Sequence, residues 1–337
     1  MDLSDVTVVV LSRGREEILA RTLAYWAEVN ISVLVLHNTN APLSEALLSS
    51  NIEYHVDQVA YGERCGHVPE HLQTEFAILC ADDEIFIPSA IFAMKMALRS
   101  SPSLSSVGGS TIAIGKYGPI LTGTHSYSNM QSYVNNGSDC TERLQNHFND
   151  GAGYRNGGIY RLLRKDLMIE LMETFHEVAS ISTPYIYEVT GEIIVNAYGP
   201  SLYLENVYWI RNWINAPVGH KYWDRKLYFA NWMSEVKYDE EVQRWNHILM
   251  SHLQLPANNY KECIENVVRL RQSSEEREIA SLSRRLIPIS VNIKWFIRKM
   301  LIPKTLPNSV DTSLGRMHNS GAIFTRSEIF HAISFLV

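Results

Sequence analysis

The feature that most restricts the fold is a run of β-branched residues near the start of the chain. Residues Val6–Leu11 read VTVVVL, without the polar alternation of a half-exposed strand, which is typical of a strand buried on both faces. A helix with apolar residues along one face follows from Glu16, and a second buried run occupies Ile31–Leu36. This strand–helix–strand unit predicts a parallel pair of strands joined by a right-handed crossover.

The same alternation continues along the first 115 residues. It predicts a doubly wound, Rossmann-like α/β domain with a mixed sheet. Residues 116–136 are rich in Gly, Ser, Asn and Tyr, which indicates a long, mobile loop of the kind that often carries function. Further strands are expected at Ile52–Val56, Phe76–Cys80, Val107–Ile114, Ile159–Leu163 and Leu202–Ile210, and further helices at 89–99, 140–148, Lys165–Phe175 and Tyr187–Asn196.

The character of the sequence changes beyond residue 235. Charged amphipathic patterns at Glu240–Leu253 and Tyr260–Leu286 predict a helical appendage, which divides the chain into 1–235 and 236–337. Within the appendage, residues 284–304 contain six basic and no acidic residues, interleaved with large apolar ones. This stretch favours either peripheral docking on an anionic membrane surface or a helix that packs on the main domain or on a second copy in a homodimer.

Composition excludes several classes of protein. The net charge of −6 argues against a nucleic-acid binder with a broad basic surface. No uncharged apolar run reaches the ~18–20 residues that span a bilayer, and the N-terminus has acids before its apolar run, unlike a secretory signal. The four cysteines have neither disulfide-like nor zinc-like spacing, which indicates reduced thiols and a cytoplasmic protein.

Three consecutive carboxylates follow the buried strand Phe76–Cys80. Asp82, Asp83 and Glu84 should lie at the carboxyl edge of the sheet, where ligands bind in open α/β folds. Three adjacent acids repel one another unless a cation offsets them, and hard oxygen ligands suit Mg²⁺ or Mn²⁺. The alternative is an acidic turn that caps the helix beginning near Ser89.

The opening segment VTVVVLSRGREEILARTLAYW resembles that of GT-A-fold glycosyltransferases of the family-2 type. Those proteins begin with an apolar strand, a polar turn containing an arginine, and a helix of this kind. Residues 5–215 also resemble a bacterial group of surface-polysaccharide glycosyltransferases, which have an acidic triplet, a C-x-E-R-L helix and a Y-x-x-x-R strand. The matching segments are Asp82-Asp83-Glu84, Cys140–Leu144 and Tyr160–Arg164, with Tyr208–Arg211 after them.

This resemblance implies a glycosyltransferase. It would move a sugar from a nucleotide-sugar donor to a hydroxyl of a glycan or lipid-linked glycan acceptor, in polysaccharide or lipopolysaccharide synthesis, with residues 1–235 as its catalytic domain. The acidic triplet would be the DxD-type motif that binds Mn²⁺ or Mg²⁺. Ala81 stands where the first Asp of that motif is often found, so the metal is expected on Asp83 and Glu84, with Asp82 reaching the ribose or a phosphate.

The resemblance also implies a nucleotide site. The family usually has an Asp at the end of the second strand, whereas this chain has His37 and Asn38, so an amide or imidazole would recognise the base. Charge on the leaving diphosphate would be stabilised by nearby arginines. The alternative for each is a solvated surface residue, and for Arg64 taken singly the sequence favours that alternative. The expected donor-binding residues are Ser12, Arg13, Arg15, Asn38, Arg64 and Asp82, with Lys116 behind the arginines.

An inverting enzyme also needs a general base for the acceptor hydroxyl. In the superfamily this acid begins a helix about eleven residues before a glycine, and Glu188 stands at that interval before Gly199. Glu192, one helical turn later, is the second candidate, and an ordinary first-turn glutamate is the alternative for Glu188. His220 is a candidate metal ligand or a structural histidine. Acceptor stacking or core packing would involve Tyr127, Tyr154, Trp209, Trp213, Tyr222 and Trp223.

The sequence leaves two other functions open. A sugar-nucleotidyltransferase has a similar sheet, but it normally has a glycine-rich phosphate loop after the first strand, and residues 12–15 contain one glycine. A non-catalytic glycan-binding or assembly subunit with the same fold is the other, against which the acidic triplet argues mildly.

Overall fold

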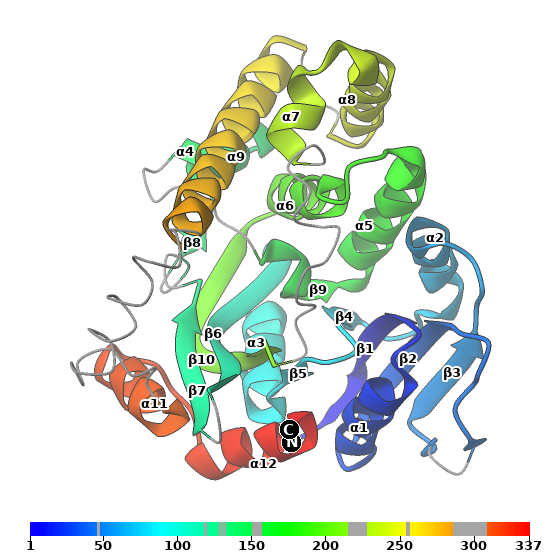
Figure 1. Cartoon of the computed structure of the whole chain (residues 1–337), viewed down its shortest axis with the longest axis vertical. Helices are drawn as coiled ribbons and strands as arrows, with labels where there is room; N and C mark the ends of the chain where they lie inside the picture. Colours follow the sequence, from blue (N-terminus) through cyan, green and yellow to red (C-terminus); the bar gives the residue numbers. More distant parts are fainter. Residues whose placement is uncertain are drawn as a thin grey trace.

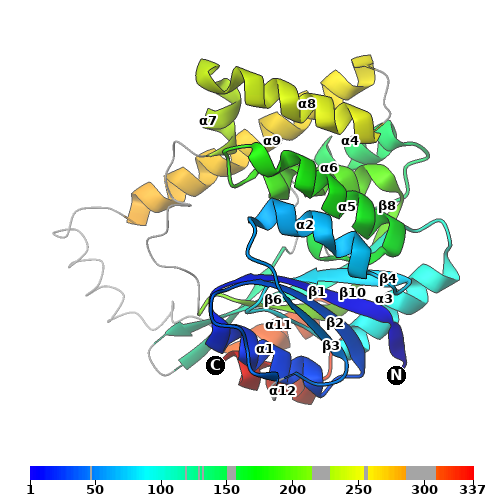
Figure 2. The same cartoon turned by 90° about the vertical axis from the view of Figure 1, so that its right-hand side faces the viewer.

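The computed structural model describes residues 1–45, 48–117, 120–127, 130, 133–149, 157–214, 228–253, 257–285 and 309–337. Within these residues a ten-stranded mixed sheet forms the centre of the molecule, and helices cover both of its faces (Figures 1 and 2). The strand order is β3-β2-β1-β4-β9-β6-β10-β5, with β7 paired to β6 and β8 paired to β10. The predicted mixed α/β fold is confirmed.

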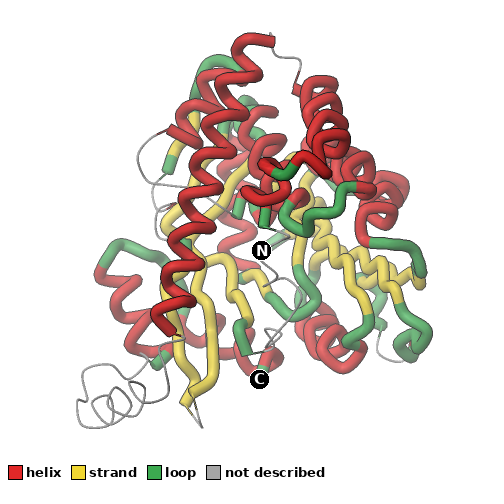
Figure 3. The backbone as a smooth tube through the Cα atoms, turned by 45° about the horizontal axis from the view of Figure 1, so that its top comes forward, coloured by secondary structure: helices red, strands yellow, loops and turns green. Residues whose placement is uncertain are grey.

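Figure 3 shows the strands beside one another in yellow, with the helices in red around them. The strands are β1 (Leu3–Arg13), β2 (Ile31–Asn38), β3 (Ile52–Val56), β4 (Phe76–Cys80), β5 (Ile85–Phe86), β6 (Ser106–Tyr117), β7 (Ile120–Ser126), β8 (Val134–Asn135), β9 (Leu162–Arg164) and β10 (Ser201–Asn212). The α-helices are α1 (Glu16–Ala27), α2 (Tyr61–His71), α3 (Pro88–Ser100), α4 (Cys140–Asn149), α5 (Lys165–Glu177), α6 (Ile186–Tyr198), α7 (Phe229–Ser234), α8 (Asp239–Leu253), α9 (Ala257–Arg285), α11 (Val310–Asn319) and α12 (Arg326–Leu336).

Strand β1 lies inside the parallel part of the sheet, between β2 and β4. Its valines alternate between two cores: Val8 and Val10 pack with the helices of one face, and Val9 packs with those of the other. Burial on both faces explains why the segment is almost continuously apolar. The sheet is mixed because the short strand β9 runs antiparallel to both β4 and β6, and because β5, β7 and β8 also pair antiparallel with their neighbours.

The two faces carry different helices (Figure 2). Helices α1, α3, α11 and α12 cover one face, and α2, α5 and α6 cover the other, with α7, α8 and α9 stacked beyond them. Residues 236–337, expected as one helical region, are therefore divided. Helices α8 and α9 extend the stack on α6 and α4, whereas α11 and α12 return to the sheet and pack against β7 and α1. Of the described helices, none is long and apolar enough to cross a membrane.

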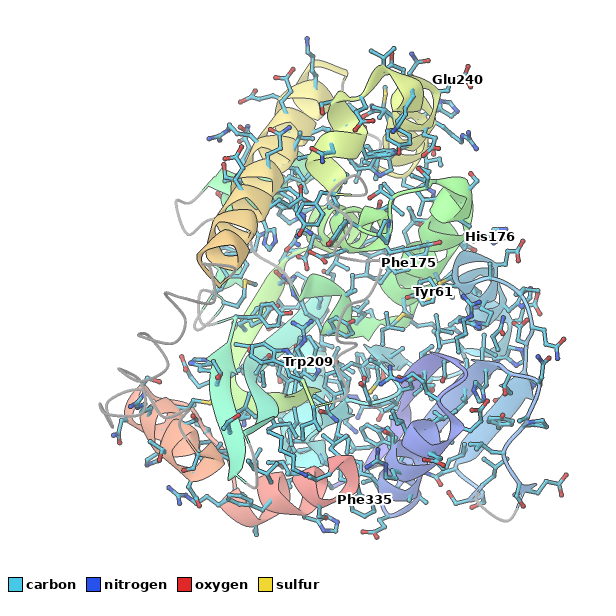
Figure 4. The ribbon with its side chains drawn as sticks, in the orientation of Figure 1. Tyr61, Phe175, His176, Trp209, Glu240 and Phe335 are labelled. Atoms are coloured by element: carbon cyan, nitrogen blue, oxygen red, sulfur yellow. The ribbon has the colours of Figure 1, made fainter. Side chains whose placement is uncertain are left out.

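Helix α2 has no counterpart among the predicted elements. Its sequence, YGERCGHVPEH, has two glycines and a proline and little apolar periodicity. The glycines allow close packing: a Cβ on Gly62 would stand 2.4 Å from the Cβ of Ala179, and one on Gly66 would stand 2.9 Å from the ring of His176. Tyr61 and Phe175 both lie near this contact in Figure 4. Tertiary packing, and not local preference, holds this helix in place.

The expected loop at 116–136 is partly a strand. Strand β7 pairs antiparallel with β6 from Tyr117↔Ile120 to Thr111↔Ser126, which makes a long hairpin. The expectation of a mobile loop over this whole segment was wrong. Its Gly, Ser and Thr residues give only a weak strand signal, but the hydrogen bonds to β6 stabilise a strand there.

Candidate active site at the carboxyl edge of the sheet

The acidic triplet lies where the parallel strands end. Strands β1 and β4 are adjacent, so the turn after β1 faces the residues after β4. Asp82, Asp83 and Glu84 are between 6% and 9% exposed. Burying carboxylates this far is costly unless they are paired and hydrogen-bonded, so their partners decide what the site can do.

The first two acids are held by the turn that follows β1. Ser12 Oγ donates to Asp82 Oδ2 at 2.7 Å, and Arg15 Nη1 lies 3.0 Å from Asp82 Oδ1. The other terminal nitrogen of Arg15, Nη2, donates to Asp83 Oδ2. One guanidinium therefore bridges two neighbouring carboxylates, and the arginine side chain is still 38% exposed. Burial raises the pKa of Asp82, against the lowering effect of Ser12 and Arg15.

The backbone of this turn is unusual. Gly14 and Arg15 both adopt left-handed conformations, with φ of 60° and 61°, and Arg15 is also the N-cap of α1. A non-glycine residue at positive φ is uncommon, and such residues concentrate at functional sites. The turn is supported by His37, whose Nε2 lies 3.0 Å from the carbonyl of Gly14. Since a carbonyl only accepts, Nε2 donates this bond, and Nδ1 lies 2.8 Å from the hydroxyl of Tyr54.

The third acid faces the opposite side of the edge. Trp209 Nε1 donates to Glu84 Oε2 at 2.7 Å, and Arg211 Nε lies 3.6 Å from Glu84 Oε1. Burial raises the pKa of Glu84 to about 8, and the charges of Asp83 and Asp82 add to this effect while Arg211 opposes it. Like-charge repulsion within the triplet is thus only partly offset by the two arginines.

An aromatic cluster adjoins Glu84. The rings of Tyr127 and Trp209 stack at 5.5 Å with planes 10° apart, and Tyr160 lies 4.4 Å from Trp209 on a tilted plane. Arg211 lies over both stacked rings, 5.6 and 5.7 Å from their centroids, and donates to the Tyr127 hydroxyl. Trp209 lies near the centre of the view in Figure 4. We call Tyr127, Tyr160, Trp209 and Arg211 the aromatic platform.

A buried arginine lies on the other side of the turn after β1. Arg64, in the first turn of α2, is 1% exposed, and its Nε and Nη1 have no hydrogen-bond partner within the described part of the chain. Burial lowers the pKa of Arg64, and the nearby charge of Arg13 lowers it further, while Asp57 opposes them. The Asn38 side chain donates to the carbonyl of Val59 at 2.7 Å, just before this helix. Unpaired buried donors of this kind suit an anionic ligand.

Glu188, the first candidate base, acts electrostatically on the aromatic platform. Its side chain, in the first turn of α6, is 27% exposed, and Oε1 accepts from Arg271 Nη1 at 2.5 Å. Burial raises the pKa of Glu188, and Arg271 opposes that rise. Burial raises the pKa values of Tyr127 and Tyr160, and the charge of Glu188 adds to both, so the carboxylate and the platform share one electrostatic environment.

Glu192 has a different environment. It is fully buried, and it accepts from the backbone N–H of Gly158 and from His147 Nε2, the latter at 3.2 Å. A Cβ on Gly158 would stand 2.7 Å from Glu192 Oε2, so the carboxylate fills the space beside the short 3₁₀ turn Gly158–Tyr160. These contacts tie α6 to the turn and place the carboxylate out of reach of an acceptor in solution.

The structure thus brings together Ser12, Arg15, Asp82, Asp83 and Glu84, with Asn38 and Arg64 around the adjacent turn. Arg13 and Lys116 are exposed, and Trp213 is 47% exposed just past the end of β10. The other predicted positions, Tyr154, His220, Tyr222, Trp223 and the basic stretch from residue 286 to 304, lie outside the described residues.

Sequence reasoning missed three members of this site. Arg211 is the penultimate residue of β10, at the carboxyl edge, so strand-end position was a usable signal for it. Tyr160 lies in the turn before β9, and its only signal was its place in the motif Tyr160–Arg164. Arg271 carried no such signal. It comes from the middle of α9, 83 residues after Glu188, and only the packing of α9 against α4 and α7 brings it to the carboxylate.

No family model and no curated protein matches the sequence. Among solved structures, the bifunctional IspDF of Campylobacter jejuni is similar with a TM-score of 0.32 and 8% identity, over 60% of this chain and 49% of that one. The chain thus spans about half the length of that protein. A mannose-1-phosphate geranyltransferase from Thermus thermophilus is similar with a TM-score of 0.30 and 14% identity, over 61% of this chain and 75% of that one. Likenesses this distant say nothing of the reaction, which must be inferred from the residues of the site.

Proposed function

We propose that this protein is a glycosyltransferase that transfers a sugar from a nucleotide-sugar donor to a hydroxyl group of a glycan acceptor, in bacterial surface-polysaccharide or lipopolysaccharide synthesis. The supporting observation is the meeting, at one sheet edge, of an acidic triplet, two arginines and a stacked aromatic pair. The donor diphosphate needs the charged groups, and the sugars need aromatic faces and polar groups.

A divalent cation, Mn²⁺ or Mg²⁺, fits the donor atoms of the triplet. Oδ1 of Asp83 makes no hydrogen bond to any described residue, and Oε1 of Glu84 has the ion pair with Arg211 Nε at 3.6 Å. Arg15 and Trp209 occupy the other oxygen of each carboxylate. Asp83 and Glu84 would hold the ion, as oxygen-rich sites do for hard cations. When bound, it would supply positive charge for the donor diphosphate.

The arginines of the edge are proposed to hold the diphosphate and to stabilise its charge as it leaves. Arg15 is partly exposed and already directed at the triplet, and Arg64 offers unpaired donors from the base of α2. Asp82, fixed by Ser12, is proposed to bind the ribose or a phosphate. Asn38 lies where the nucleoside would be recognised, at the carboxyl end of β2.

Glu188 is the proposed base in an inverting transfer. It would take the proton of the acceptor hydroxyl while that oxygen bonds to the anomeric carbon and the bond from this carbon to the diphosphate breaks. A base works best when its pKa approaches the working pH, and burial shifts the pKa of Glu188 in that direction. Arg271 acts as a positioning residue because it fixes one carboxylate oxygen.

The test is a thermal-shift screen of the whole chain with nucleoside diphosphates and cytidine monophosphate, with and without Mn²⁺, followed by assay of sugar release from the matching donor. The proposal expects one nucleotide class to raise the melting temperature more strongly with Mn²⁺. Pyrophosphate release from a nucleoside triphosphate and a sugar 1-phosphate would instead identify a sugar-nucleotidyltransferase. Failure of every nucleotide to bind would show that the acids serve only as structural partners of Arg15 and Arg211, as in a non-catalytic subunit.

A further inference from the structure

We propose that the outer edge of the sheet carries a second metal site, formed by Glu53, His55 and His71, which binds a borderline transition-metal ion such as Zn²⁺. It lies on β3, the strand at the end of the sheet order, and on the last residue of α2. It is independent of the strand-end acids and of the glycosyl transfer proposed for them.

The geometry is that of a set of ligands already gathered around one point. Glu53 and His55 are two residues apart on β3, so their side chains lie on the same side of the strand. Glu53 Oε1 lies 2.7 Å from His55 Nε2 and also 2.7 Å from His71 Nδ1, and the two imidazole rings are 4.3 Å apart. One ligand atom from each residue lies within 4.8 Å of the others.

The donor set selects the kind of metal. Two imidazole nitrogens and one carboxylate oxygen match the three protein ligands of many open zinc sites, whose Zn–N and Zn–O bonds measure about 2.0–2.2 Å. A fourth position would remain for water. Mg²⁺ and Mn²⁺ prefer oxygen donors and therefore favour the carboxylates at the strand ends. The side chains of Glu53, His55 and His71 are 51%, 39% and 28% exposed, so an ion can enter from solvent.

Metal binding would replace hydrogen bonds that Glu53 now accepts from the two histidines. Both imidazoles must offer a lone pair to the ion. The ion would then tie the C-terminal end of α2 to β3.

The chain offers a matched control on the same helix. His67 lies one turn before His71 and pairs with Asp57, with its Nδ1 2.6 Å from Oδ2. Like His71 it contacts a carboxylate, but it does not belong to the cluster of three ligands. The variants to compare are His55→Asn, His71→Asn and His67→Asn, all of which change partly exposed side chains.

The experiment is calorimetric titration of the metal-stripped whole chain with Zn²⁺, and separately with Mg²⁺. We expect one saturable Zn²⁺ site in the parent chain and in His67→Asn, and an affinity lower by about tenfold or more in His55→Asn and His71→Asn. Mg²⁺ should not compete for it. Zn²⁺ affinity unchanged in His55→Asn and His71→Asn, or no saturable Zn²⁺ binding in the parent, would overturn the proposal.

Thermal melting supplies a second measurement. Zn²⁺ should raise the melting temperature of the parent and of His67→Asn, because a ligand that binds only the folded state stabilises it. It should raise that of His71→Asn less or not at all, while equal melting temperatures without metal show that the variant is folded. Equal stabilisation of His71→Asn and the parent by Zn²⁺ would also overturn the proposal.

Discussion

The two halves of the candidate site have different chemical environments, although the acids of both come from one run of three consecutive residues. On the side of β1, Asp82 and Asp83 meet Ser12 and Arg15 in a polar, charged environment. On the side of β10, Glu84 meets Trp209 and the rest of the aromatic platform. The turn after β4 directs adjacent side chains to different neighbours, so an ion held by Asp83 and Glu84 would lie where the two halves meet.

This difference suggests a division of labour. The polar half, together with Arg64, has the charges that a nucleoside diphosphate requires. The platform half, with Glu188 close to its tyrosines, has the flat apolar faces and the carboxylate that an acceptor sugar requires. Changes in the first half should impair donor binding, and changes in the second should impair transfer.

The largest expected effect is that of Asp83→Ala. Removing this carboxylate should abolish Mn²⁺-dependent stabilisation by the nucleotide, because Asp83 is one of two proposed metal ligands. Thermal shift with and without Mn²⁺ measures it. Glu75→Ala is the matched control, since Glu75 directly precedes the same strand but is half-exposed and pairs with Arg99. If Asp83→Ala still binds the nucleotide in a Mn²⁺-dependent way, the polar half is not the donor site.

The next effect concerns the proposed base. Glu188→Gln should lower the transfer rate by about 10²–10⁴-fold, the usual contribution of general-base catalysis, and leave nucleotide binding unchanged. Glu240→Gln, another first-turn glutamate on an exposed helix, is the control and should transfer normally. If Glu188→Gln turns over at the parental rate, the base is elsewhere and the platform half loses its assigned role.

A smaller effect is expected from the packing of α2. Gly62→Ala should destabilise the fold by about 1–3 kcal/mol, because the new methyl group would overlap Ala179. On an exposed helix the same change would be stabilising by up to about 1 kcal/mol, so the sign of the effect tests the contact. Chemical denaturation measures it. A neutral or stabilising result would show that α2 is not pressed against Ala179 in solution.

The smallest effect is a change in pH dependence. Arg271 lowers the pKa of Glu188, so Arg271→Met should raise that pKa. A base must be ionised, and activity is lost as pH falls through its pKa; the acidic limb of the rate profile should therefore move to higher pH, with little change at alkaline pH. The measurement is kcat as a function of pH. If the acidic limb of this profile does not move in Arg271→Met, the group that titrates there is not Glu188.

Local pattern was sufficient for most of the α/β core and for the position of the acids. Continuous apolar strands such as Val6–Leu11 leave few alternatives to a sheet buried on both sides, and residues after such strands must lie at its carboxyl edge. The prediction failed where neighbours decide the conformation. Helix α2 has little helical signal of its own, and β7 forms only because β6 is available to pair with it.

The candidate site likewise divides into features that the sequence predicts and features that only tertiary contacts decide. The alternation of strands and helices, read directly from residue order, specified the fold class and placed Asp82, Asp83 and Glu84 at the carboxyl edge of the sheet. Other features depend on contacts between segments that are distant in the chain. Such contacts decide the direction of each carboxylate, and they bury Glu192 while Glu188 pairs with Arg271. They also bring His55 on β3 and His71 on α2 to one glutamate. Periodicity records which face of an element is buried, but it holds no information on which other element covers that face.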